Sequence, residues 1–291
     1  MGDMQAVTGD SPLIDTILGN EIGIRLFFFF GVLAVMMALE AAFPRRVRGF
    51  SRSQRWPANI AIVFLDSLIV RAMFPIAAVG MAAIAESRDW GLFNMLDAPL
   101  WLAIPLSVLL LDFAIYAQHV LFHKVPALWR LHRMHHADLD FDVTTGARFH
   151  PIEIILSMAI KMVVVVILGA PAVAVVIFEV LLNGTAMFNH ANLKLPLGID
   201  RIVRLVFVTP DMHRVHHSAI RRETDSNYGF NLTWWDRLCG TYRPQPEKGH
   251  DRMTIGLEYF REPVDLRLDK MLLQPLRNDT GDTENKSSKE D

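Results

Sequence analysis

The chain has 291 residues, of which 52% are hydrophobic and 21% are charged, and its formal net charge is −2. Soluble domains usually carry more charge and less continuous apolar sequence, so this balance favours a membrane protein. The near-neutral charge gives no electrostatic basis for binding nucleic acid, which we do not expect as a partner. The single cysteine excludes a disulfide and a cysteine-ligated iron–sulfur cluster within this chain.

Four apolar regions predict an all-α, integral membrane helical bundle. A helix that crosses a bilayer needs about 20 mostly apolar residues. Residues 22–43, 60–85 and 99–122 each meet this requirement, although Asp66 and Arg71 interrupt the second region. Residues 152–188 are too long for one span and are broken at Gly169-Ala170-Pro171, so we expect a helical hairpin there. The predicted bundle therefore has three spans plus this hairpin.

The polar ends of the chain define its predicted boundaries. Residues 1–21 form an N-terminal polar segment, residues 22–276 a membrane-embedded domain, and residues 277–291 a tail that its composition predicts to be disordered. Within the domain, residues 195–208 contain Arg201 and Arg204 and are expected to form a helix at the membrane interface.

Basic residues predict how the spans are oriented. Cytoplasmic loops of membrane proteins are enriched in lysine and arginine. Five arginines crowd the loop after the first span: Arg45, Arg46, Arg48, Arg52 and Arg55. This loop is therefore expected in the cytoplasm, and the third span and the hairpin return the chain to the same side. The cap that follows residue 189 is accordingly predicted to be cytoplasmic.

Eleven histidines are present, and ten of them belong to one pattern. An H-x-x-x-H pair occupies 119–123, and two H-x-x-H-H strings occupy 132–136 and 213–217. Residues three and four apart share one face of a helix, so the imidazoles of a string can bind a common ion. The eight clustered histidines supply enough nitrogen donors for two metal ions. The predicted ligands are His119, His123, His132, His135, His136, His213, His216 and His217, with His150 and His190 as single candidates between the clusters.

A structural role for these histidines is the alternative. A lone histidine, such as His250, is usually a surface residue or a hydrogen-bonded core residue. Three clusters that border membrane segments on one side do not fit chance, and buried imidazoles without a metal would leave many nitrogens unpaired. The pattern therefore indicates a metal centre, although imidazole suits iron, zinc, copper and nickel alike.

One carboxylate in the third apolar region is predicted to support this centre. On a helix, Asp112 falls on the same face as His119 and His123. A carboxylate in a membrane span is costly, and orienting a ligating imidazole through its far N–H would justify that cost. A polar contact between helices is the other interpretation. Glu153 and Asn192 are weaker candidates for the same supporting role.

These strings resemble the fatty acid hydroxylase / sterol desaturase superfamily of integral-membrane, non-haem iron enzymes. Besides the three clusters, the matching strings are Arg148-Phe-His150-Pro151-Ile-Glu153, Phe188-Asn-His190-Ala-Asn192, Asn227-Tyr228-Gly229, Trp235-Asp236-Arg237-Leu238 and Gly240-Thr241-Tyr242. Together they extend from 112 to 242, about half of the chain, and form the motif core of the predicted domain.

The resemblance implies a di-metal site in a cytoplasmic, histidine-rich helical cap, with His190 and His150 as further ligands. Two iron ions and O2 would then oxidise a C–H bond of a lipid, such as a sterol or a fatty acyl chain, to an alcohol or an alkene. Zinc can replace iron in an isolated preparation. The lipid would enter from the bilayer, and the electrons would come from a separate electron-transfer protein. The strings at 227–229 and 235–236 are expected to pack the cap against the site.

Two other functions remain open from the sequence. A membrane metal-binding or transport protein predicts ionisable residues along a continuous path through several spans, whereas in the three single spans only Asp66, Arg71 and Asp112 fall deep. A zinc-dependent hydrolase needs about three protein ligands and an open position, and no H-E-x-x-H string is present. The particular lipid and the oligomeric state are left open.

Overall fold

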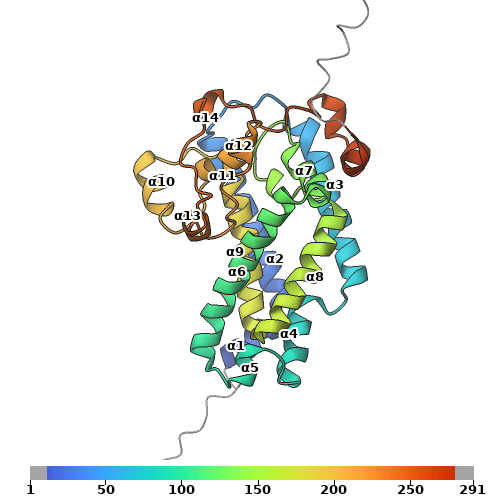
Figure 1. Ribbon diagram of the computed structural model, residues 1–291, viewed down its shortest axis with the longest axis vertical. Helices are drawn as coiled ribbons and strands as arrows, with labels where there is room; N and C mark the ends of the chain where they lie inside the picture. Colours follow the sequence, from blue (N-terminus) through green and yellow to red (C-terminus); the bar gives the residue numbers. More distant parts are fainter. Residues whose placement is uncertain (1–11, 279–291) are drawn as a thin grey trace, which may run out of the picture.

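The computed structural model describes residues 12–278, and this part of the chain is built from helices (Figure 1). Long helices form the lower part of the molecule in Figure 1, and short helices and loops form a cap above them. Between residues 12 and 278 there is no strand, and only isolated β-bridges such as the one between Pro44 and Leu193 occur. The predicted all-α class is confirmed.

Five helical stretches of the described chain are long and apolar enough to cross a membrane. They are α2 (Glu21–Ala42), the stretch Arg52–Met95, α6 (Leu100–Lys124), α8 (Pro151–Leu168) and α9 (Ala172–Asn189). Large apolar side chains on their outer faces, including Phe27, Phe64 and Trp101, are 74%, 70% and 76% exposed. Such exposure is stable against lipid rather than water, so the chain is a multi-pass membrane protein.

The second apolar region is not one continuous helix. It comprises α3 (Arg52–Met73), α4 (Ala77–Ser87) and the short α5 (Leu92–Met95). The break lies at Pro75, which has no backbone N–H and keeps the preceding residue out of the helical conformation. Helix α3 also begins earlier than the apolar run, at a capping box formed by Ser51 and Gln54.

The hairpin expected in residues 152–188 is present as α8 and α9. Gly169 ends α8 with a φ of +63°, a conformation that glycine adopts without strain, and Pro171 precedes the first turn of α9. A Cβ at position 169 would lie 2.8 Å from the carbonyl oxygen of Trp90, so the close packing also requires glycine. The hairpin returns the chain to the side on which α8 begins, and residues 150 and 190 flank its two ends on this cap side.

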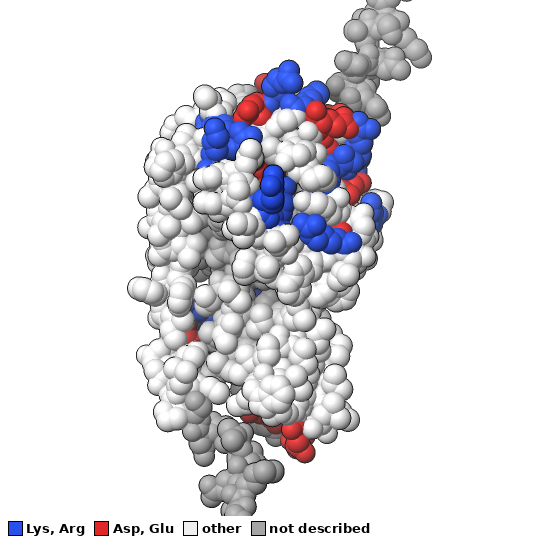
Figure 2. Space-filling model, turned by 90° about the vertical axis from the view of Figure 1, so that its left-hand side faces the viewer, with Lys and Arg blue, Asp and Glu red and all other residues white. Residues whose placement is uncertain are grey.

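The cap consists of short helices joined by loops. Its α-helices are α7 (Pro126–His136), α10 (Leu197–Val203), α11 (Pro210–His216), α12 (Arg221–Thr224), α13 (Trp234–Leu238), α14 (Gly249–Arg252) and α15 (Leu268–Leu273). Its 3-10 turns are η1 (Thr145–Ala147), η2 (Pro263–Leu266) and η3 (Gln274–Leu276). Charged side chains gather on the cap, whereas the helical bundle below shows a largely uncharged surface (Figure 2). This division is the one expected of a membrane-embedded bundle with a water-exposed cap.

The structure describes contacts at both predicted domain boundaries, which stay predictions. A helix, α1 (Pro12–Gly19), lies within the segment expected to be polar, and it packs against α9. At the other end, the Arg277 side chain forms an ion pair of 2.6 Å with Asp265, and its carbonyl oxygen accepts a hydrogen bond from Arg133. Contacts with the cap therefore include Arg277. Residues 1–11 and 279–291, including most of the predicted tail, lie outside the described part.

Helix α10 occupies the middle of the stretch expected to lie at the membrane interface. Leu197 and Ile202 on this helix are 78% and 69% exposed, and Arg204 is ion-paired with Asp200 at 2.7 Å. Exposed leucine and isoleucine are consistent with an interfacial helix, which stays a prediction.

Candidate metal centre

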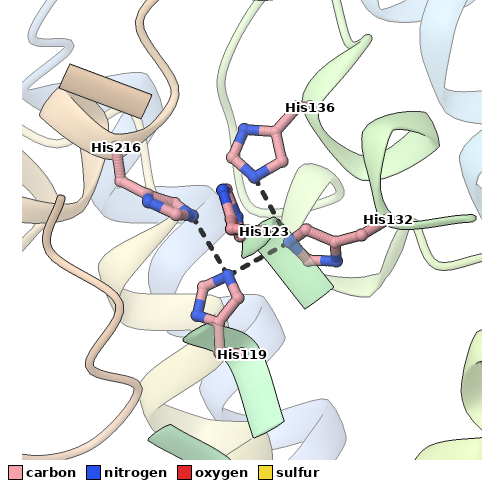
Figure 3. A group of neighbouring side chains, drawn as sticks. All are labelled: His119, His123, His132, His136 and His216. Carbon is pink, nitrogen blue, oxygen red and sulfur yellow. Dashed lines mark hydrogen bonds between the residues drawn. The ribbon is translucent and has the colours of Figure 1, made fainter. Parts of the chain in front are cut away.

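Nine histidines converge where α6, α7, α9 and α11 meet. They form two groups, and in each group one nitrogen from every member lies within 4.8 Å of the others. The first group is His119, His123, His132, His136 and His216, and the second is His135, His190, His213 and His217. All nine side chains are buried, with at most 3% exposed. Figure 3 shows the five rings of the first group pointing toward one another from α6, α7 and α11.

The helical spacing explains why each H-x-x-H-H string serves both groups. Consecutive residues on an α-helix point about 100° apart, so the two histidines of an H-H doublet face different directions. His136 therefore joins the first group and His135 the second, and His216 and His217 divide in the same way. The ring centroids of His136 and His217 are 4.6 Å apart, which places the two groups side by side.

Four rings of the first group have Nδ1 close to a protein oxygen. These contacts are His119 with the Tyr228 carbonyl (2.7 Å), His132 with Glu153 Oε1 (2.6 Å), His216 with the Ser226 carbonyl (2.7 Å) and His123 with Asp225 Oδ1 (3.3 Å). A carbonyl oxygen can only accept, so Nδ1 of His119 and of His216 carries the proton and each Nε2 presents a lone pair. An ionised Glu153 accepts from Nδ1 of His132 in the same way.

The lone pairs of these rings meet at short range. Nε2 of His119 lies 3.1 Å from Nε2 of His132 and 3.1 Å from Nε2 of His216. Without a proton between them, these nitrogens repel one another, and a cation removes the repulsion. Two imidazoles bound to one ion at about 2.1 Å hold their nitrogens roughly 3 Å apart. The observed spacing therefore fits a metal ion.

The second group has the same arrangement. His190 donates from Nδ1 to the Ala186 carbonyl at 2.8 Å, so its Nε2 also presents a lone pair. That Nε2 lies 3.2 Å from Nε2 of His135 and 3.0 Å from Nε2 of His213. Both ring nitrogens of His217 are buried and have no hydrogen-bond partner within the described chain. A metal ion would bind one nitrogen of His217 together with the three Nε2 atoms.

Burial keeps the rings in the protonation state that a metal requires. Because desolvation disfavours the imidazolium form, the pKa of His132 falls to about 3 and that of His190 to about 4. Burial likewise lowers the pKa values of His135 and His213 well below their ordinary value. Neutral imidazoles are the form that binds metal, so the site is ready to bind an ion at pH 7.

The structure leaves two histidines out of both groups. His150, a predicted ligand, is the N-cap of α8: its Nδ1 accepts a hydrogen bond from the backbone N–H of Ile152. Its Nε2 lies 3.3 Å from the Leu272 carbonyl. Both nitrogens thus have protein partners, and His150 belongs to neither ligand group. His250, which was expected to lie outside the pattern, is buried and lies 3.6 Å from Asp211.

Asp112 supports the site differently from the prediction. Its carboxylate contacts none of the histidines and instead accepts a hydrogen bond of 2.8 Å from Nε1 of Trp235. It also accepts from the backbone N–H groups of Asn231 and Leu232 at 3.3 Å each. Asp112 therefore fastens the 231–235 turn to α6. The face of α6 that carries Asp112 is directed toward this turn of the cap.

The partner of His119 Nδ1 is the Tyr228 carbonyl, which belongs to the Asn-Tyr-Gly string. Asp236 fixes that string by accepting hydrogen bonds from the backbone N–H groups of Tyr228 and Gly229 at 2.8 and 2.9 Å. The strings at 227–229 and 235–236 thus pack the cap against the site, as the resemblance implied. A backbone carbonyl leaves no signature in residue type, so this partner could not be read from the sequence.

The two weaker candidates have separate roles. Glu153 is the carboxylate that binds Nδ1 of His132, and with 3% exposure it is shielded from water. Asn192 contacts none of the ligand groups: its side chain accepts from the backbone N–H of Arg46 and donates to the Arg46 carbonyl. It fixes the loop after α2 against the end of α9.

Sequence reasoning missed a buried ion cluster directly after α7. Arg55 is fully buried and contacts Asp138 at 2.7 Å and Asp142 at 2.6 Å. Burial alone would raise the pKa of Asp138, but the Arg55 guanidinium overcomes that effect and holds the pKa well below its usual value. The D-x-D-x-D string at 138–142, which follows the histidine cluster, was the available signal. The cluster ties α3 to the loop that follows the ligand helix.

A cavity of about 500 Å³ lies below the first histidine group. His119 and His132 form part of its wall, and apolar residues including Phe29, Met158 and Phe230 form much of the rest. Its volume is within the range that holds small ligands. The cavity gives a molecule between the membrane helices access to the histidine-lined end.

Comparisons with known proteins agree with this geometry. Residues 104–241 match the model of the family described as fatty acid hydroxylase. The chain is 32% identical over 149 residues to an ornithine lipid hydroxylase from Rhizobium tropici, a match that covers 51% of this chain and 44% of that protein. It is 26% identical over 252 residues to an alkylglycerol monooxygenase from Xenopus tropicalis, covering 84% of this chain and 52% of that protein.

A cholesterol 25-hydroxylase from Rattus norvegicus is also similar, at 27% identity over 156 residues, covering 53% of this chain and 50% of that protein. The matches thus span about half the length of these curated relatives. No solved structure matches the chain.

Proposed function

Because residues 104–241 belong to the fatty acid hydroxylase family, we propose that this chain is a membrane-bound, O2-dependent oxidoreductase that hydroxylates or desaturates a lipid. The hydroxylation balances as R–H + O2 + 2 electrons + 2 protons giving R–OH and water. The two electrons are expected from a separate electron-transfer protein. Names of relatives that include lipid hydroxylases and monooxygenases support this class of reaction.

The observation that carries the proposal is the convergence of unprotonated Nε2 atoms at the end of a cavity between membrane helices. His119 and His132 belong to a ligand group and also line that cavity. A metal ion held by the first group would thus face whatever enters the cavity. Breaking an unactivated C–H bond requires redox chemistry that side chains cannot supply, and a bound pair of iron ions would supply it through O2.

The protein's own residues then have three tasks. Nine imidazoles would hold two ions, one in each group, and protein oxygens fix the orientation of five of the rings. Apolar residues of the cavity, such as Phe230 and Phe149, position the substrate and exclude water. The buried cluster around Arg55 holds the loop after α7 in place.

The proposal is tested by producing the chain in iron-supplemented cells and comparing their lipids with those of cells producing His135→Ala. The expected result is a lipid that gains one oxygen, or loses two hydrogens, only with the unchanged chain. With ¹⁸O2, the alcohol gains the heavier isotope. Metal analysis of the purified protein should give about two iron ions per chain. Zinc in stoichiometric amount, with no lipid change and no O2 consumption under any reductant, would favour the hydrolase or metal-binding function.

The proposed cytoplasmic position of the cap can be tested with Cys239. This exposed residue is the single cysteine of the chain and follows α13 in the cap. A membrane-impermeant maleimide should label it in inverted vesicles and leave it unlabelled in intact cells whose outer membrane has been permeabilised. Labelling from the outside would show that the cap lies on the opposite side of the membrane.

A further inference from the structure

Trp129 on α7 links the first ligand group to the water-exposed side of the cap. Its ring centroid lies 4.9 Å from that of His123 and 5.4 Å from that of His136, so the indole packs directly against two ligand rings. Unlike these buried histidines, Trp129 is only partly buried. One side chain is therefore in contact with the ligands and with solvent.

The other aromatic residues beside the ligand rings are placed differently. Three of them have at most 1% of their surface exposed: Phe122, Phe141 and Tyr228. Phe149 and Phe230 also pack against ligand rings, but they line the cavity between the membrane helices. Among the aromatic residues between positions 12 and 278, Trp129 is therefore the one that connects a ligand group with the surface of the cap.

Arg221, an exposed cation on α12, lies over the Trp129 ring. Its guanidinium carbon is 4.7 Å from the ring centroid, and Nη2 donates a hydrogen bond to the His123 carbonyl. Oδ2 of Asp225 accepts from Nε of Arg221 at 2.9 Å, and its Oδ1 lies 3.3 Å from Nδ1 of His123. A charged surface residue is thus separated from a ligand ring by a single contact.

A surface hollow of about 310 Å³ adjoins this site. Its lining residues include Lys248, Arg261 and the residue directly before Arg221. Leu257, which also lines the hollow, belongs to the same hydrophobic cluster as Trp129. The hollow, Arg221 and Trp129 therefore form one continuous surface of the cap.

This surface carries more positive than negative charge. Its exposed cations are Lys124, Arg221, Arg222, Lys248 and Arg261, and its carboxylates are Asp225, Glu247 and Glu258. Five cations against three carboxylates leave two positive charges in excess. A partner with an acidic surface complements this charge, which would speed its encounter with the cap.

We infer that this docking surface, defined by Trp129, the hollow and the five cations, binds the electron-transfer protein, and that this partner is a small acidic carrier of one electron. The inference rests on the proposed function and names where its electrons enter. At each encounter the reduced centre of the carrier loses one electron, which passes by way of Trp129 toward the first ligand group. Two encounters supply the two electrons of the hydroxylation.

The test measures docking on the purified full chain in lipid nanodiscs. The probes are a plant-type [2Fe–2S] ferredoxin and a cytochrome b5 haem domain, which are acidic, and cytochrome c, which is basic. Biolayer interferometry measures their binding without metal or turnover. We expect an acidic carrier to bind at least about tenfold more tightly than cytochrome c. Raising the salt from about 30 mM to about 300 mM should weaken this binding, because it screens the exposed charges.

A charge-reversal pair assigns the binding to the docking surface. Arg222→Glu combined with Lys248→Glu should weaken binding of the acidic carrier at least about tenfold, since it reverses two exposed cations. Arg201→Glu combined with Arg267→Glu is the matched control. It makes the same change in net charge at exposed positions on α10 and directly before α15, and should leave the binding unchanged.

Two further measurements locate the carrier and the entry of the electron. In hydrogen exchange, a bound carrier should protect residues 219–225 and 254–261, which border the hollow. Trp129→Leu should keep the carrier bound, because the cations remain. At equal iron content, however, this variant should oxidise the reduced carrier more slowly than the unchanged chain.

The outcomes separate this inference from the proposed function. Acidic carriers that bind no more tightly than cytochrome c, or exchange protection confined to other parts of the chain, would overturn the inference and leave the lipid oxidoreductase intact. Equal weakening by both charge-reversal pairs would overturn it as well, and unchanged carrier oxidation in Trp129→Leu would overturn the route through the indole. Salt-sensitive docking at this surface by a protein that neither holds iron nor oxidises any lipid would support the docking surface and overturn the proposed reaction.

Discussion

Nε1 of Trp235 donates a hydrogen bond of 2.8 Å to Oδ2 of Asp112, and this contact joins α6 to the cap across 123 residues of sequence. The same carboxylate accepts two backbone N–H groups of the 231–232 segment. Three residues before that segment, the Tyr228 carbonyl binds Nδ1 of His119. Asp112 contacts no imidazole itself, but it fixes the loop whose Tyr228 carbonyl orients the His119 ring.

Asp112→Asn should loosen this loop. The substituted amide offers one acceptor atom and presents N–H groups to donors, so we expect a loss of about 1–3 kcal/mol of stability and a lower metal content. Trp235→Phe removes a single hydrogen bond and should have a smaller effect of about 1 kcal/mol. Thermal unfolding in detergent and metal analysis measure both. Unchanged unfolding and full metal content in Asp112→Asn would contradict this role.

His135→Ala should abolish lipid oxidation and reduce the metal content, because it removes a member of the second ligand group. His150→Ala should retain the metal and lose only the N-cap of α8, at about 1 kcal/mol. His250→Ala, outside both groups, should also retain the metal. Equal metal loss in all three variants would mean that the ligand assignment is wrong.

Glu153→Gln should weaken metal binding about 10–100-fold, since a carboxylate that holds the far nitrogen of a ligand fixes its orientation and raises its basicity. Competition with a chromophoric chelator gives the affinity. Glu86→Gln, at an exposed position of α4, is the control and should match the unchanged chain. A Glu153→Gln protein with unaltered affinity would show that His132 is positioned by packing alone.

The buried rings should make the protein sensitive to acid. Their folded pKa values lie below the unfolded value of about 6.5, so above that pH both states are neutral and no penalty exists. As the pH falls below about 6.5, the unfolded chain binds protons that the folded chain excludes, and stability decreases. Unfolding temperature and metal release at pH 7.5, 6.5 and 5.5 measure this effect. A double variant, His135→Ala with His213→Ala, should show a shallower dependence, and equal unfolding temperatures at all three pH values would contradict it.

Arg55→Met should destabilise the fold by about 3–5 kcal/mol, because it removes the buried cation that contacts both Asp138 and Asp142. Arg88→Met, at an exposed position, is the control and should change stability by less than about 0.5 kcal/mol. Thermal unfolding in detergent compares the two. Similar stability of both variants would show that water or other groups compensate the negative charges of Asp138 and Asp142.

The helices and the kinds of side chain that gather at the site are predictable from local sequence. Apolar length identified the membrane helices, and Gly169-Ala170-Pro171 identified the turn of the hairpin, because each depends on local backbone chemistry. The spacing of the histidine clusters identified eight residues that the fold brings together, since helical periodicity is also a local property.

The packing of the helices fixes which side chains and carbonyls meet. It divided the H-H doublets between two groups, brought His190 into the second group and left His150 as an N-cap. It also brings Asp112 into contact with the cap and Arg55 into contact with two aspartates. These contacts join residues tens of positions apart, and their partners include backbone carbonyls that every residue possesses. Only the packing of the helices determines which of those carbonyls reaches a ring.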